Sequence, residues 1–146
     1  MPGMDLLVEF FRHNAMMNGR LLDACRQLSP AQLGATATGT YGSIGATLVH
    51  IANAQEGYAA RFLGTERPER LEESATQVAE EREVEVIGDD PPGTWRMPGP
   101  LLLLQAVNHG TEHRSQVATI LTQLGIQPPE MDGWTYFLDI GHMVEV

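Results

Sequence analysis

The feature that most constrains the fold is an amphipathic run near the C-terminal end of the chain, which follows Pro98-Gly99-Pro100 and ends near Gly125. Apolar and small residues recur in it at spacings of three and four, which is the pattern of an α-helix with one face against a core. This stripe consists of Leu103, Ala106, Gly110, Val117, Ile120, Leu121 and Leu124. His109 and His113 lie on or beside the stripe. We therefore expect a long helix that carries both imidazole rings toward the interior.

The spacing of these two histidines favours a metal site. Residues four apart on an α-helix are rotated by about 40° and separated by roughly 6 Å along the axis, so both rings can reach toward one point. Neutral imidazole nitrogens are good ligands for a divalent metal. Two ligands do not complete a site, however, so a third has to come from elsewhere in the chain.

Of the other three histidines, His50 is the best candidate for the third ligand. It lies in a second segment of helical period, from Ser43 to Leu63, in which Ser43 is the expected N-cap and Gly64 the expected C-cap. Small neighbours such as Ala54 leave room for a bulky ring and an ion. His13 and His142 are expected at the boundary of the core and at the surface.

Burial of polar rings in apolar surroundings is costly unless the rings are hydrogen-bonded or ligated. One interpretation is that His50, His109 and His113 bind a divalent metal. The other is that they are core histidines hydrogen-bonded to backbone or carboxylate groups, which is the ordinary state of a buried histidine. The helical spacing of the pair favours the metal.

The chain resembles the DinB-like proteins, including the YfiT-type metal-dependent hydrolases. The motifs that carry the resemblance are TLVHIANAQEGY around His50, NHGTEHRSQVATILTQLG, and the following PPEMDGWTYF. It extends from Leu6 to Phe137. The resemblance implies a four-helix bundle in which one histidine of the second helix and two of the last helix bind a divalent metal, and these positions match His50, His109 and His113. It also implies hydrolase or thiol-transferase activity for some members.

The remaining elements follow from local signals. A first helix is expected over Asp5–Leu28, ended by Ser29-Pro30, and its buried stripe would be Leu7, Phe10, Phe11, Met17, Leu21, Cys25 and Leu28. A short turn through Leu33 and a glycine- and threonine-rich loop over Gly34–Gly42 follow. Tyr41 of this loop is expected to pack against the end of the bundle. A short apolar element over Gly133–Leu138 is expected to cover the bundle.

The middle of the chain departs from the family pattern. Pro68–Arg82 has helix-forming composition but a thin apolar face, which predicts a shortened third helix. Glu83–Ile87 alternates as a strand does, and Thr94–Met97 is a candidate return strand of a small β-hairpin. A short third helix would leave bundle surface uncovered, so we expect a second subunit to cover it and form a homodimer.

Composition bounds the class of protein. The chain has 146 residues, enough for a single domain over residues 1–146 with a proper core. No apolar run approaches the length of a membrane span, and the N-terminus lacks the features of a signal peptide. The one cysteine, Cys25, excludes an internal disulfide and is expected in the core. These features predict a cytoplasmic protein that does not bind membranes.

The charged residues exclude several functions. All nine cations are arginine, so neither a Schiff-base lysine nor a phosphate-binding P-loop lysine is available. The net charge of −10 argues against nucleic acid as a partner. The segment Glu66–Asp90 holds ten acids and three arginines, which is typical of a solvated face.

Three histidine ligands would leave a coordination position open, as in catalytic metal sites. The predicted activity is a metal-dependent hydrolase or thiol S-transferase acting on a small-molecule substrate, with a low-molecular-weight thiol as a candidate cosubstrate. The cofactor is one divalent ion, zinc or nickel first, with iron, manganese or copper as alternatives. The competing interpretation is a non-catalytic bundle with a structural metal or a bound small hydrophobic ligand.

Glu112 is the candidate catalytic or orienting carboxylate. HGTEH also fits the HxxEH pattern of inverzincin proteases, but those enzymes need a distant glutamate ligand, and only 33 residues follow His113. We therefore expect Glu112 to form a salt bridge or to orient a histidine ring. Asn53, Asn108 and Gln116 are further candidates for this orienting role.

Overall fold

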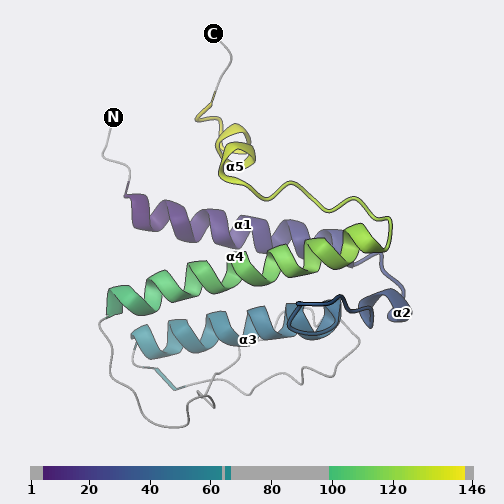
Figure 1. Cartoon of the computed structure of the whole chain (residues 1–146). Coiled ribbons are helices and arrows are strands. Elements are labelled where there is room, and N and C mark those ends of the chain that lie inside the picture. Colours follow the sequence, from purple (N-terminus) through teal and green to yellow (C-terminus); the bar gives the residue numbers. More distant parts are fainter. Residues whose placement is uncertain (1–4, 64, 67–98, 144–146) are drawn as a thin grey trace.

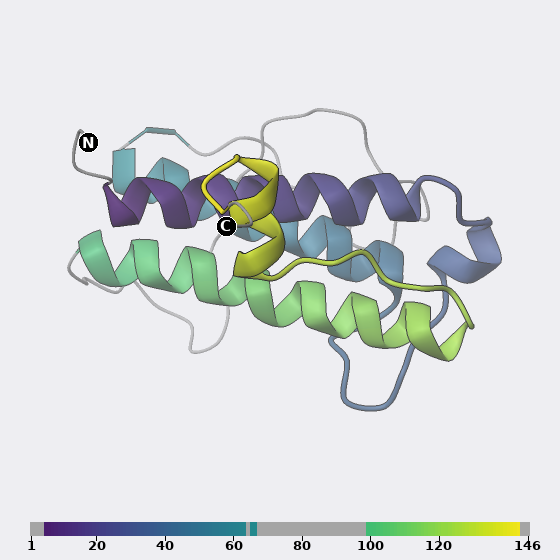
Figure 2. The ribbon, with the colours of Figure 1, turned by 90° about the horizontal axis from the view of Figure 1, so that it is seen from above.

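The computed structural model describes residues 5–63, 65–66 and 99–143, and these residues fold entirely as helices and loops. The all-α prediction is therefore confirmed for this part of the chain. The helices are α1 (Leu6–Cys25), α2 (Pro30–Leu33), α3 (Ile44–Leu63), α4 (Gly99–Gln123) and α5 (Gly133–Asp139). The three long helices lie side by side, with α4 in contact with both α1 and α3, as Figures 1 and 2 show. None of the described helices combines the length and hydropathy needed to cross a membrane.

Several predictions fall on residues outside the described part. These are the shortened third helix over Pro68–Arg82, the hairpin strands Glu83–Ile87 and Thr94–Met97, the C-cap Gly64 and nearly all of the acidic segment. The homodimer rests on the length of that third helix, so it stays a prediction.

Helix α1 begins where expected and ends three residues early. The Asp5 carboxylate caps it by accepting from the backbone N–H groups of Leu7 and Val8. The predicted end at Leu28 was wrong, because the helix ends at Cys25 and Leu28 packs against the core from the following turn. The periodic pattern includes Leu28 in the helix because the turn keeps its side chain on the side of the core.

The α2 and α3 segments were predicted closely. Ser29 and Gln32 form a reciprocal capping box at the start of α2, and Pro30 occupies its first turn. Loop residues 34–42 then lead to α3. Ser43 caps α3 as expected, since its Oγ accepts from the N–H of Ala46 at 3.1 Å.

The C-terminal part of the chain turns back over α1. Gly125 has a positive φ of 72°, and the N–H of Ile126 reaches the carbonyl of Leu121 at 2.9 Å, which closes α4 near the predicted end. Helix α5 then lies against α1 (Figure 1), where the Tyr136 hydroxyl donates to Glu9 Oε2 at 2.6 Å. The predicted apolar cover is made by Tyr136, which is buried, whereas Trp134, Phe137 and Leu138 are exposed.

The main core lies at the α2 end of the long helices. Its buried members are Leu21, Cys25, Leu33, Ile44, Leu48, Val117, Ile120 and Leu121. Burial raises the pKa of the Cys25 thiol to about 11, so the thiol is protonated at neutral pH. Cys25 is thus the small core residue that its spacing predicted.

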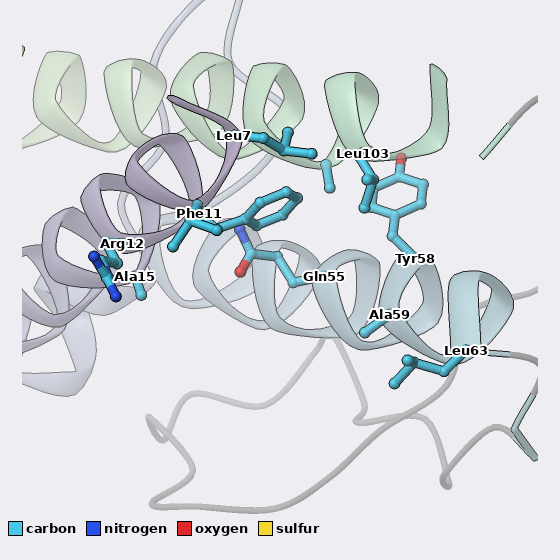
Figure 3. Close-up of a pocket in the computed structure, with 11 residues that line it drawn as sticks. Leu7, Phe11, Arg12, Ala15, Gln55, Tyr58, Ala59, Leu63 and Leu103 are labelled. Carbon is cyan, nitrogen blue, oxygen red and sulfur yellow. The ribbon is translucent and has the colours of Figure 1, made fainter. Parts of the chain in front are cut away.

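The other end of α1 does not form the predicted buried stripe. Leu7 and Phe10 are 46% and 49% exposed. Leu7 and Phe11 instead line an apolar cavity of about 640 Å³ bounded by α1, α3 and α4, which Figure 3 shows. The cavity is also lined by Val8, Arg12, Ala15, Gln55, Tyr58, Ala59, Leu63, Leu103 and Ala106.

Candidate metal centre

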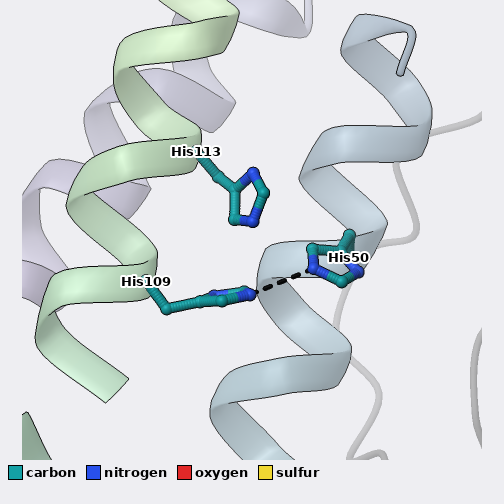
Figure 4. A group of neighbouring side chains, drawn as sticks. All are labelled: His50, His109 and His113. Carbon is teal, nitrogen blue, oxygen red and sulfur yellow. Dashed lines mark hydrogen bonds between the residues drawn. The ribbon is translucent and has the colours of Figure 1, made fainter. Parts of the chain in front are cut away.

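Three imidazole rings converge between α3 and α4 (Figure 4). His50 comes from α3, and His109 and His113 come from α4, one helical turn apart. One nitrogen of each ring lies within 4.8 Å of the corresponding nitrogen of the other two. The Nε2 atoms of His50 and His109 are 3.0 Å apart. The three residues that the sequence predicted as neighbours are therefore neighbours.

This donor set fits a divalent ion. Two imidazole nitrogens that share a tetrahedral ion at about 2.0–2.1 Å are separated by roughly 3.3 Å. The 3.0 Å separation of His50 Nε2 and His109 Nε2 is close to that value. The third nitrogen is within 4.8 Å, so side-chain shifts of about an ångström would bring all three into contact with one ion.

The other two histidines lie away from this cluster. His13 on α1 packs edge-on against the ring of Tyr136, with the centroids 5.4 Å apart. His142 is exposed near the end of the described chain. Both lie outside the cluster, as expected.

Burial perturbs the titration of the His109 ring. Its pKa is lowered to about 4, first by removal from water and then by the neighbouring rings of His113 and His50. His109 is therefore neutral at physiological pH, and the neutral imidazole is the form that binds metals. Its Nδ1 atom is buried with no hydrogen-bond partner among the described residues.

Tyr41 covers the histidine cluster from the loop before α3. Its ring stacks on that of His50, with centroids 4.0 Å apart and planes at 24°, and it meets the ring of His113 edge-on at 5.3 Å. The prediction that Tyr41 packs against the bundle is refined, because its contacts are the candidate ligands. Periodicity carries no signal for this placement, since Tyr41 lies in a loop.

Gln116 contacts one candidate ligand directly. Its Oε1 atom lies 2.9 Å from Nδ1 of His113, one helical turn earlier on α4. Of the residues considered for an orienting role, Gln116 makes this contact, whereas Glu112 and Asn108 are exposed and Asn53 is buried. Glu112 points about 100° around the helix from His113, and its salt bridge or orienting role stays a prediction.

A buried arginine beside the cluster was missed by sequence reasoning. Arg114 is 2% exposed, and it donates to Asn14 Oδ1 at 2.6 Å, Asn18 Oδ1 at 2.8 Å and Thr111 Oγ1 at 3.1 Å. Burial lowers its pKa to about 10, which still leaves it cationic at neutral pH. The bonds to Asn14 and Asn18 join α4 to α1. The sequence pattern that could have indicated this contact is a pair of asparagines four residues apart on α1, and such a pair is too common to predict it.

Tyr58 lies between the histidine cluster and the apolar cavity. Its ring meets that of His109 edge-on, with centroids 5.8 Å apart, and it also lines the cavity (Figure 3). The amide of Gln105 reaches its hydroxyl at 3.5 Å.

Comparison with known proteins identifies a family for the chain. A model of the DinB family matches residues 1–88 and 68–139, which together extend over nearly the whole chain. No curated protein matches the chain.

Proposed function

This chain belongs to the DinB family, and from that membership and the three-histidine cluster we propose that it is a metal-dependent enzyme. His50, His109 and His113 would hold one divalent ion. Zinc or nickel is the first choice, and iron, manganese or copper are alternatives, because imidazole suits several of these ions.

The observation that carries the proposal is the state of His109. Removal from water lowers the pKa of this ring to about 4, and its Nε2 lies 3.0 Å from that of His50. A polar nitrogen withdrawn from water is costly to the fold unless its lone pair is used. Coordination of a cation by three neutral rings would use those lone pairs.

The proposed reaction is hydrolysis or thiol S-transfer on a small molecule. A bound divalent ion supplies Lewis acidity and lowers the pKa of a coordinated water or thiol. The protein would contribute three neutral donors that leave a coordination position open. In S-transfer, the thiol sulfur forms a bond to an electrophilic carbon, the leaving group departs with its electron pair, and the thiol proton goes to solvent.

Residues around the cluster would shape access to the reacting molecule. Tyr41 is 45% exposed as a residue, and its ring covers His50 on the side of the loop. The Tyr58 ring stands against His109 on the side of the cavity. A substrate would therefore approach between two aromatic surfaces, which exclude water from part of the cluster.

The competing function is a non-catalytic bundle with a structural metal or a hydrophobic ligand. The observation that favours a ligand is the apolar cavity of about 640 Å³, a volume within the range of roughly 300–1,000 Å³ typical of small-molecule sites. In this case the metal would stabilise the fold without turnover.

Removal and return of the metal distinguishes the two functions. Protein purified without a histidine tag is stripped with a chelator and reloaded with zinc or nickel. Both forms are assayed for hydrolysis of esters and amides and for transfer of a low-molecular-weight thiol to an electrophilic carbon. We expect turnover by the loaded form that falls to background in the stripped form and returns on reloading. A melting temperature that depends on the metal, with no turnover in either class, would support the structural alternative instead.

A further inference from the structure

We propose that Gln116 is a positioning residue that fixes which nitrogen of His113 faces the histidine cluster and holds the Tyr41 ring over His50. The expected effect of Gln116 on metal affinity rests on the proposed function. The expected effect of Gln116 on which ring nitrogen of His113 carries the hydrogen applies to the metal-free protein as well. Both consequences follow from a single oxygen atom.

The identity of that atom is settled by its second contact. The backbone N–H of Tyr41 donates to Gln116 Oε1 at 3.0 Å. A backbone N–H can only donate, so the atom facing it is the amide oxygen rather than the amide nitrogen. The usual ambiguity of a glutamine side chain is thereby removed.

The same oxygen decides the tautomer of His113. It lies 2.9 Å from Nδ1 of His113, and an amide oxygen can only accept a hydrogen bond. Nδ1 must therefore carry the hydrogen, which leaves the lone pair of the neutral ring on Nε2. Because an amide oxygen has two lone pairs, it can accept from His113 and from Tyr41 at once.

The bond to Tyr41 ties the loop to α4. Tyr41 lies 75 residues before Gln116, and this bond fixes the backbone from which the Tyr41 ring stacks on His50 at 4.0 Å. Gln116 thus orients one candidate ligand directly and restrains the aromatic cover of another through the loop. Partners that orient ligating histidines typically change metal affinity about 10- to 100-fold when removed.

The test compares Gln116→Met, which loses the acceptor at similar size, with Gln116→Glu, which keeps it. The control is Gln123→Met, the same change at an exposed position of α4. Side-chain ¹⁵N shifts of His113 are measured by NMR in metal-free protein near pH 8.5, about two units above the ordinary imidazole pKa. Zinc affinity is then measured by competition with a chromophoric chelator, and circular dichroism checks folding.

We expect His113 to carry hydrogen on Nδ1 in the wild type, in Gln116→Glu and in Gln123→Met. In Gln116→Met the hydrogen should redistribute toward Nε2, the ring-current shift of the His50 protons from Tyr41 should diminish, and zinc affinity should fall about 10- to 100-fold. A wild-type His113 with hydrogen on Nε2, or an unchanged tautomer in Gln116→Met, would overturn the proposal. If Gln116→Met does not fold, the wild-type and Gln116→Glu tautomers still decide it. Failure of the wild type and of every variant to bind zinc, nickel, iron, manganese or copper, with the tautomers as expected, would refute the proposed function and leave the positioning role of Gln116 standing.

Discussion

Replacement of His113 by alanine is expected to abolish stoichiometric metal binding. His113 is 7% exposed, it is one of three converging donors, and its loss leaves only His50 and His109. Loss of a ligand itself should cost more than the roughly 10- to 100-fold that loss of an orienting partner costs. Metal content is measured by mass spectrometry on protein purified without a histidine tag and dialysed against a weak chelator.

His142→Ala is the matched control for this experiment. His142 is exposed and lies outside the cluster, so this variant should keep the full metal content of the wild type. Circular dichroism separates a folded, metal-free His113→Ala from an unfolded one. Equal metal in the two variants would mean that the ion is bound elsewhere.

Gly110→Ala is expected to destabilise the protein, although alanine ordinarily stabilises a helix relative to glycine. A Cβ at position 110 would lie 2.6 Å from Asn14 Oδ1, 3.0 Å from Arg114 Nη1 and 3.1 Å from Gln55 Nε2. Asn14 cannot yield easily, because it is 2% exposed and accepts from Arg114 at 2.6 Å. Relief of the overlap would strain or break that charge-assisted bond. We expect a loss of about 1–3 kcal/mol in the free energy of unfolding, measured by urea denaturation.

Gly19→Ala is the matched control, and it is expected to raise the free energy of unfolding instead of lowering it. Gly19 lies within α1, and a Cβ there would meet nothing within 4 Å. Only the helix preference of alanine acts at this position, so the free energy of unfolding of the variant should rise by about 0.5–1 kcal/mol. If Gly110→Ala were as stabilising as Gly19→Ala, the close approach of α1, α3 and α4 around Gly110 would be refuted.

The long helices and the histidine cluster could be predicted because their signals are local and periodic. The four-residue spacing of His109 and His113 fixes their relative direction on any α-helix. Ser43 marks the start of α3 by ordinary capping chemistry, which sets the position of His50 within that helix. Pairing of the two helices around one metal was implied by the resemblance to the DinB-like proteins.

The parts that could not be predicted depend on contacts between distant segments. Tyr41 reaches the cluster through the path of a loop, and Gln116 was one of four candidates until its contact with His113 Nδ1 distinguished it. Arg114 is charged, and charged residues are rarely buried, so composition places it at the surface. Its burial depends on two asparagines of α1 about a hundred residues away.

The most direct test of the three-histidine site is anomalous diffraction from crystals of the zinc-loaded protein, recorded above and below the zinc absorption edge. We predict one peak between α3 and α4, bonded to the Nε2 atoms of His50, His109 and His113 at about 2.0–2.1 Å. Stoichiometric zinc at other residues, with no peak among these three rings, would contradict the account.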